Sequence, residues 1–182
     1  GLDMNGKTIE MAYNPAQNGH RATWEGNWWP DGKKSSSEAY VQAYYFSLDA
    51  VTGELYSVIH DRVLGGNANT GFDAALNQNA GEYEALAKEK AVQLGAIKGA
   101  VKTAKYEGQG FTNNDPDISF SLTGENGDRA QLRFSRHDKE LLAVTFNAGM
   151  KDMDVAEQEA EDFAKRAEEY LRQHPDAQTY EE

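Results

Sequence analysis

The feature that most constrains the fold is a β-hairpin pattern that occurs twice in the chain. The stretch "FSLDAVTGELYSV" at 46–58 matches "FSRHDKELLAV" at 134–144. A helix-like segment follows each copy, at 80–98 and at 153–173. This order indicates an internal duplication of β-strands followed by a helix. In the alignment the second turn is two residues shorter, with Phe46, Ser47, Glu54, Leu55 and Val58 matched to Phe134, Ser135, Glu140, Leu141 and Val144.

The strands of the second copy alternate apolar and polar side chains, which is typical of an antiparallel sheet buried on one face. A shorter similarity lies upstream of each hairpin, where "TWEG" at 23–26 resembles "KYEG" at 105–108. This match pairs Trp24 with Tyr106 and predicts a core position for Trp24. The apolar face of the second copy is expected to carry Ile118, Phe120, Leu122, Ala130, Leu132, Phe134, Leu142, Val144 and Phe146.

Each sheet is expected to be covered by the helix that follows it. Asp154 and Glu157 have the spacing of a capping box and predict a helix start near Asp154. The predicted fold is α+β, a tandem repeat of an antiparallel β-sheet packed by one α-helix, with repeats at 1–98 and 99–182. The second helix would use an apolar stripe formed by Met153, Ala156, Ala160, Phe163, Ala167 and Leu171.

Charge and composition exclude several classes of partner. The 182 residues include 30 acidic and 18 basic side chains, a net charge of −12 that repels nucleic acid and anionic lipid surfaces. No apolar run reaches the roughly 20 residues of a membrane span. The absence of cysteine excludes disulfides and thiolate metal sites. The first ten residues hold no secretion signal, so any such signal was removed or was never present.

No catalytic or cofactor motif emerges, so neither an enzyme nor a cofactor is expected. The four histidines lack H-x-x-x-H spacing, and Phe72 stands where a phosphate loop needs lysine. Asp49 is interpreted as a turn residue and His60 as a structural histidine. The carboxylate pairs 115/117 and 125/128 are interpreted as turns, and a hydrolase that uses acidic residues is the weakest of the alternatives.

Aromatic residues provide the candidate binding site. Trp28, Trp29 and Tyr40 fall in one segment that could present a stacking surface to a glycan or a peptide. Tyr45 belongs to the hairpin face that does not carry Phe46, a face that something else should cover. A glycan-binding module that uses the aromatic residues of 24–40 is therefore the alternative to a protein-binding module.

The turn "SLDAVTGELYSV" resembles the strand, D-x-x-T-G-E turn and strand of PepSY-type domains and of the related YcdB/YcdC-type repeats. The likeness is best over 40–60, extends to the helix at 82–97 and recurs more weakly over 117–173. It implies a small antiparallel sheet packed by a helix, and a bacterial extracytoplasmic protein, secreted or anchored to the cell surface. It also implies a non-enzymatic regulatory module whose partner is a protein, such as a peptidase that it inhibits or an envelope regulator. The insertion "WEGNWWPDGKKSSS" departs from a minimal domain of this kind.

Overall fold

The computed structural model describes residues 8–17, 20–30, 42–64 and 71–174. Within these ranges the chain forms two groups of four strands. The first group is followed by two helices and the second by one. The first group comprises β1 (Glu10–Asn14), β2 (Thr23–Trp28), β3 (Ala43–Asp49) and β4 (Leu55–Asp61), followed by α1 (Ala74–Gln78) and α2 (Gly81–Gln93). The second comprises β5 (Val101–Thr112), β6 (Asp115–Gly124), β7 (Arg129–Ser135) and β8 (Leu141–Thr145), followed by α3 (Asn147–Gln173).

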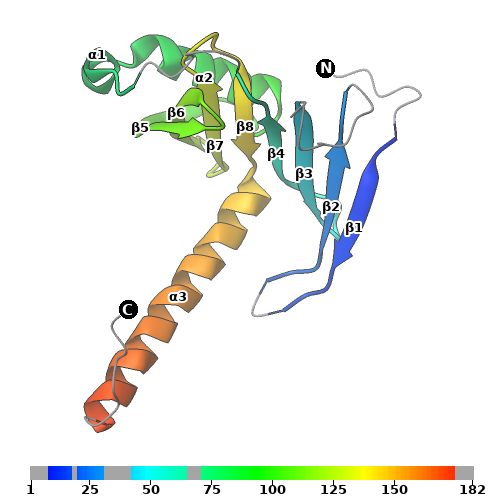
Figure 1. Ribbon diagram of the computed structural model, residues 1–182, viewed down its shortest axis with the longest axis vertical. Coiled ribbons are helices and arrows are strands. Elements are labelled where there is room, and N and C mark those ends of the chain that lie inside the picture. The colour runs from blue at the N-terminus through cyan, green and yellow to red at the C-terminus, as the bar shows by residue number, and fades with distance from the viewer. Residues whose placement is uncertain (1–7, 18–19, 31–41, 65–70, 175–182) are drawn as a thin grey trace.

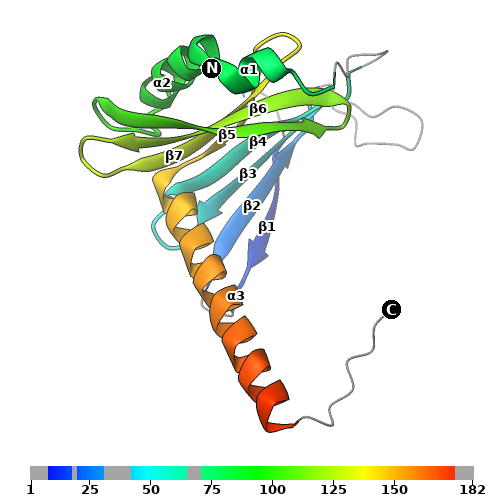
Figure 2. The same cartoon turned by 90° about the vertical axis from the view of Figure 1, so that its left-hand side faces the viewer.

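All of these strands join one antiparallel sheet in the order β1-β2-β3-β4-β8-β7-β6-β5 (Figure 1). The pairing of β4 with β8 connects the half made by β1–β4 to the half made by β5–β8. Figure 2 shows the strand direction turning steadily from β5 to β1, the twist that L-residues impose on a wide sheet. The α+β class with an antiparallel sheet is thus confirmed, whereas the repeat limits 1–98 and 99–182 stay a prediction.

One face of the sheet is apolar from edge to edge. Cross-strand partners point to the same face, so the pairing register defines a row of side chains that crosses every strand. In the half formed by β5–β8 this row lies in the core under α2, with Tyr83, Ala87 and Ala91 packed against it. From β1 to β5 the row reads Met11, Gly26, Phe46, Val58, Val144, Leu132, Phe120 and Tyr106.

The hairpin does occur twice in the structure. The predicted alignment of the two copies is shifted by two residues in the first strand of the hairpin. Each position of 43–59 corresponds to the position 86 residues later, in 129–145, with no gap. The two turns have equal length, since Asp49 N donates to Glu54 O as Ser135 N donates to Glu140 O. Phe46 and Ser47 were therefore matched wrongly. The matches of Glu54, Leu55 and Val58 to Glu140, Leu141 and Val144 are correct.

The helices cover different strands from those predicted. α2 packs on β5, β6 and β7, the strands that follow it, and not on the hairpin that precedes it. The reason is the connection, because β5 pairs at the far edge of the sheet and returns the chain beneath α2 (Figure 1). The expectation that each sheet is covered by its own C-terminal helix is therefore wrong.

α3 also begins earlier than predicted and leaves the sheet. It starts at Asn147, with Phe146 at the N-cap position, and Asp154 pairs with Arg129 instead of capping a helix. Its first turns contact β4 and β7. Figures 1 and 2 show the remainder projecting away from the sheet, so the predicted stripe does not pack on the second sheet half. Within the described ranges, no helix combines the length and the apolar character that crossing a membrane requires.

Candidate functional site

The face of the sheet opposite α2 carries a polar groove with a volume of about 750 Å³. Its floor is flat because alternate positions of neighbouring strands bring mostly small or hydroxyl-bearing side chains to this face. The register places these positions side by side, from β3 across β4, β8 and β7 to β6. The floor residues are Ser47, Ser57, Ile59, Thr145, Ala143, Gln131, Arg133 and Ser119.

Arg133 is the cation among the residues that line this groove. Its Nε is buried and has no hydrogen-bond partner among the described residues. The side chain as a whole is half-buried, so the accessible part of its guanidinium can donate to an oxygen atom of a ligand in the groove. Carboxylates also line the groove, from four different elements or loops: Glu25, Glu107, Asp117 and Asp152. The groove can therefore bind a ligand that places a hydrogen-bond acceptor against Arg133 on the floor and hydrogen-bond donors against the carboxylates.

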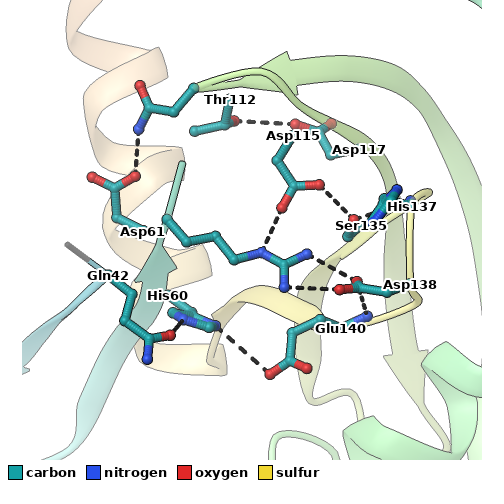
Figure 3. A network of polar contacts seen from close by, with 12 residues as sticks. Gln42, His60, Asp61, Thr112, Asp115, Asp117, Ser135, His137, Asp138 and Glu140 are labelled. Carbon is teal, nitrogen blue, oxygen red and sulfur yellow. Dashed lines mark hydrogen bonds and ion pairs between the residues drawn. The ribbon is translucent and has the colours of Figure 1, made fainter. Parts of the chain in front are cut away.

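A polar network lies beside Asp117, a groove-lining residue, where β4 ends (Figure 3). Arg62, just after β4, donates from Nε to Asp115 at 2.7 Å and from its two terminal nitrogens to Asp138 at 2.8 and 2.9 Å. Asp115 is 1% exposed, and its other oxygen accepts the hydroxyl of Ser135. The network thus connects β4 to the β5–β6 and β7–β8 turns.

Within this network the electrostatics favour the charged forms of Arg62 and Asp138. Burial opposes the charge on Arg62, but the hydrogen bonds to Asp138 and Asp115 raise its pKa above the ordinary value. The hydrogen bond from Arg62 lowers the pKa of Asp138 to about 2. Nearby, Asp117 accepts from the hydroxyl of Thr112 at 3.1 Å and so has a fixed orientation in the groove lining. The network holds the chain beside this residue in one arrangement.

His60 lies next to the network and is 8% exposed (Figure 3). Its Nε2 lies 2.9 Å from Oε1 of Gln42, and its ring stacks on Tyr44 with a centroid distance of 4.3 Å. Nδ1 has no hydrogen-bond partner among the described residues, and Glu140 lies 3.7 Å away. Burial lowers the pKa of His60 below its ordinary value, so the ring is neutral near pH 7. The prediction of a structural histidine agrees with this packing.

Another part of the groove is formed where α3 starts. A Cβ on Gly149 would clash with the backbone carbonyl of Tyr56, so glycine allows the helix to pass this close to β4. The N–H of Phe146 donates to the same carbonyl at 2.8 Å. Asp152 and Met153, one turn further along α3, line the groove. The helix start is therefore a wall of the groove.

The described members of the predicted aromatic site, Trp28, Trp29 and Tyr45, are each buried or half-buried. Trp28 is buried, 6% exposed, and stacks on Tyr44 at 5.2 Å between ring centroids. Trp29 is half-buried, and Tyr40 lies outside the described residues. Tyr45 is half-buried beside Ile59 and thus on the groove face. A glycan site at these residues stays a prediction.

Two other expectations differ from the structure. Trp24, predicted in the core, is 38% exposed on β2 and packs on Tyr13, because it is not equivalent to Tyr106 in the sheet register. The "NNDPD" segment is a turn only at Asn113 and Asn114, whose φ angles are 50° and 67°. Asp115 and Asp117 already belong to β6 and are buried there.

Sequence reasoning missed Arg62 and Arg133, the two arginines that matter most here. For Arg133 a signal existed, since a charged residue in the middle of an alternating strand points away from the core and marks the polar face. For Asp115 the signal was the Asn-Asn pair, which favours a two-residue hairpin turn and makes the next residue the start of a strand. Arg62 gave no such signal, because its partners come from turns more than 50 residues away in the sequence.

Comparison with known proteins adds a distant structural likeness. No protein-family model matches the chain, and no curated protein matches it. A solved structure, the C-terminal domain of YpeB from Bacillus megaterium, is similar with a TM-score of 0.44 and 11% sequence identity. The match covers 80% of this chain and 57% of the YpeB domain. At this distance the likeness carries no argument about function, and the proposals below stand on the sequence and the geometry of this chain.

Proposed function

We propose that this chain is a non-enzymatic, bacterial, extracytoplasmic module that binds and regulates a partner protein, and that the polar groove receives an extended segment of that partner. The observation that carries this proposal is the half-buried Arg133 on the groove floor, whose Nε has no partner among the described residues. A carboxylate or a main-chain carbonyl of the partner would pair with the accessible part of this guanidinium.

The lining of the groove suggests which segment fits. Small and hydroxyl side chains such as Ser57, Ser119 and Thr145 leave room for a main chain to lie across the floor. Glu107 and Asp152 on the rim accept hydrogen bonds from N–H groups or lysine. The preferred ligand is therefore an extended segment with an acidic residue for Arg133 and basic residues on either side.

The location and the regulatory role rest on sequence. The D-x-x-T-G-E turn at 49–54 resembles that of PepSY-type domains, which act outside the cytoplasm and often beside peptidases. In this chain Asp49 shapes that turn, since its Oδ1 accepts from the N–H groups of Val51 and Thr52, both at 2.8 Å. A peptidase or an envelope regulator is the partner that this resemblance favours.

A peptide-display selection tests the proposal. Random twelve-residue peptides on phage are selected against the immobilised chain, and the enriched peptides are synthesised and titrated by fluorescence anisotropy. We expect enriched peptides to share an acidic residue, and Arg133→Gln to weaken their binding about ten-fold or more, because a charge-assisted pair is lost. Lys102→Gln is the matched control, since it removes the same charge from an exposed position of β5 outside the groove.

Three outcomes would contradict the proposal. The first is peptide binding that Arg133→Gln leaves unchanged. The second is turnover of a substrate by the purified chain in a broad hydrolase screen, when that turnover is lost on replacing one carboxylate. The third is quenching of tryptophan fluorescence by cell-wall glycans that Trp29→Ala abolishes, which would support the glycan-binding alternative instead.

A further inference from the structure

The apolar face of the sheet is open on β1 and at the start of β2, whereas on β5–β8 it is covered. Towards the other end of β2 the same face is buried, because Trp28 is 6% exposed. On the shared row, Val144, Leu132 and Phe120 are at most 4% exposed beneath α2, whereas Met11 on β1 is 46% exposed. The open region continues on neighbouring positions of β1 and β2. Its exposed members are Met11, Tyr13 (53%) and Trp24 (38%), next to half-buried Phe46. Among the described residues, β1 and the start of β2 thus present an apolar surface that no helix covers.

α3 carries an apolar stripe that is not packed on the sheet along most of its length. Beyond the turns that line the groove, the stripe is exposed at Phe163 (67%) and Tyr170 (57%). These two residues share one face of the helix with the small side chains of Ala156, Ala160 and Ala167. The projection seen in Figure 2 leaves this length of helix free of the sheet.

α2 shows how such a helix and such a sheet face fit together. It follows β4 as α3 follows β8, and it uses one aromatic residue and two alanines, Tyr83, Ala87 and Ala91, against the row. The alanines let the helix axis come close to the strands. The same combination of an aromatic residue and alanines occurs on α3, so the two uncovered surfaces of the chain are complementary in kind.

We infer that the occupant of each surface is a second copy of this chain: α3 of one copy covers the open apolar face on β1 and the start of β2 of the other, and the exchange is reciprocal. The free part of α3, about 19 residues, is about 28 Å long and about 10 Å wide. In the reciprocal exchange each chain buries this helix footprint of about 280 Å² and a sheet footprint no larger than it, at most about 560 Å² in all. This area is below the roughly 800 Å² per partner of a standard specific interface, so the dimer is expected to depend on protein concentration.

Charge affects this association in a direction that can be measured. Each chain carries a net charge of −12, so two copies repel one another. Added salt screens that repulsion and leaves the apolar contact intact. The dimer is therefore strengthened by salt, whereas an association based on ion pairs would be weakened.

Mass measurement on the whole chain tests the inference. Light scattering after gel filtration, at 50 and 500 mM sodium chloride, should give twice the chain mass of 20.1 kDa, with more dimer at high salt. Phe163→Glu on α3 and Met11→Lys on β1 should each restore the monomer, because each spoils both copies of the contact. Phe72→Glu is the matched control: Phe72 is 65% exposed outside both surfaces, and this variant should remain a dimer.

Mixing the two monomeric variants provides the sharper test. A Met11→Lys chain keeps an intact helix, and a Phe163→Glu chain keeps an intact sheet face, so the mixture restores one of the two contacts and should form a heterodimer. A wild-type chain that stays monomeric at high salt would overturn the inference, as would a dimer that neither variant dissociates. Circular dichroism confirms that the variants are folded. A negative result leaves the groove proposal untouched, since Arg133 lies on the other face.

Discussion

The two copies of the hairpin, β3–β4 and β7–β8, share a backbone down to its irregularities. Both ladders carry a bulge at the corresponding position, between Ser47 and Leu48 and between Arg133 and Phe134. Residue 53 in one turn and residue 139 in the other have positive φ angles of 74° and 65°. The side chains that fix the turns differ, and this difference shows which features the hairpin itself requires.

Each turn contains a fully buried carboxylate near an arginine, but the residue that supplies this carboxylate comes from a different part of the chain in each turn. In the first turn the carboxylate is that of Asp49, a residue of the turn itself. It accepts hydrogen bonds from the main-chain N–H groups of Val51 and Thr52 and from the hydroxyl of Tyr56, and Arg21 lies 3.4 Å away. The backbone hydrogen bonds from Thr52 and Val51 lower the pKa of Asp49 to about 2, although burial opposes this.

In the second turn Ser135 occupies the corresponding position and accepts from the N–H of His137 at 3.1 Å. The carboxylate comes instead from Asp115 on β6, which accepts a hydrogen bond from the hydroxyl of Ser135 and pairs with Arg62. The hairpin thus needs an acceptor at this position and a buried negative charge behind it. One residue supplies both in the first copy, whereas two residues share the task in the second.

The largest expected effect comes from breaking the second arrangement. Asp115→Ala leaves Arg62, whose side chain is 13% exposed, without its buried partner, and should lower the free energy of unfolding by about 3–5 kcal/mol. Asp49→Ala should cost less, because the side chain of Arg21 is 70% exposed and can be solvated by water. Urea unfolding followed by circular dichroism at pH 7 compares the two variants. Equal losses would contradict the distinction between the two turns.

The next effect tests which strands α2 stabilises. Ala87 is fully buried against β5–β7, so Ala87→Leu should overpack this contact and cost about 1–3 kcal/mol. Ala85→Leu on the exposed side of the same helix is the control and should change stability by less than about 0.5 kcal/mol. Amide hydrogen exchange should show the loss of protection in β5–β7. A loss confined to β3 would restore the predicted pairing of α2 with the preceding hairpin.

The sequence was sufficient to predict what depends on local pattern. Alternation around Phe120, Leu132 and Val144 predicted the buried face correctly, because the period of two is a property of each strand alone. The glycine at position 53 predicted the first turn. Pattern could not predict which sheet half α2 covers, because that depends on β5 pairing at the far edge, a long-range event with no signature in the helix itself.

The candidate site was less predictable for the same reason. Asp115 looked like a turn residue because Asn, Asp and Pro surround it, and the tertiary pairing with Arg62 decides its role. The stripe on α3 was read correctly as amphipathic, yet an apolar stripe does not say where its partner is. The two-residue error in the hairpin alignment arose because Ser47 resembles Ser135 in type, while the turn geometry equates Ser135 with Asp49.

The smallest expected effect concerns His60 near the end of β4, which corresponds in register to Phe146, just beyond β8 in the second copy. The lowered pKa of His60 means that the unfolded chain binds a proton more readily than the folded chain. The stability contributed by the neutral ring is complete above pH 6.5 and is lost as the pH falls through the window below it. His60→Phe keeps the stacking on Tyr44 and should remove this loss, while it changes stability at pH 7.5 by less than about 1.5 kcal/mol.

Urea midpoints at pH 7.5 and 5.5 measure this difference. The exposed His174 supplies the control, since His174→Gln should leave the decline towards pH 5.5 as it is in the wild type. A decline that persists in His60→Phe would mean that another group titrates in this window. The stacking of Trp28, Tyr44 and His60 would then not depend on a neutral imidazole. Replacing His60 by the phenylalanine of the second copy would then leave the loss of stability between pH 7.5 and 5.5 unchanged.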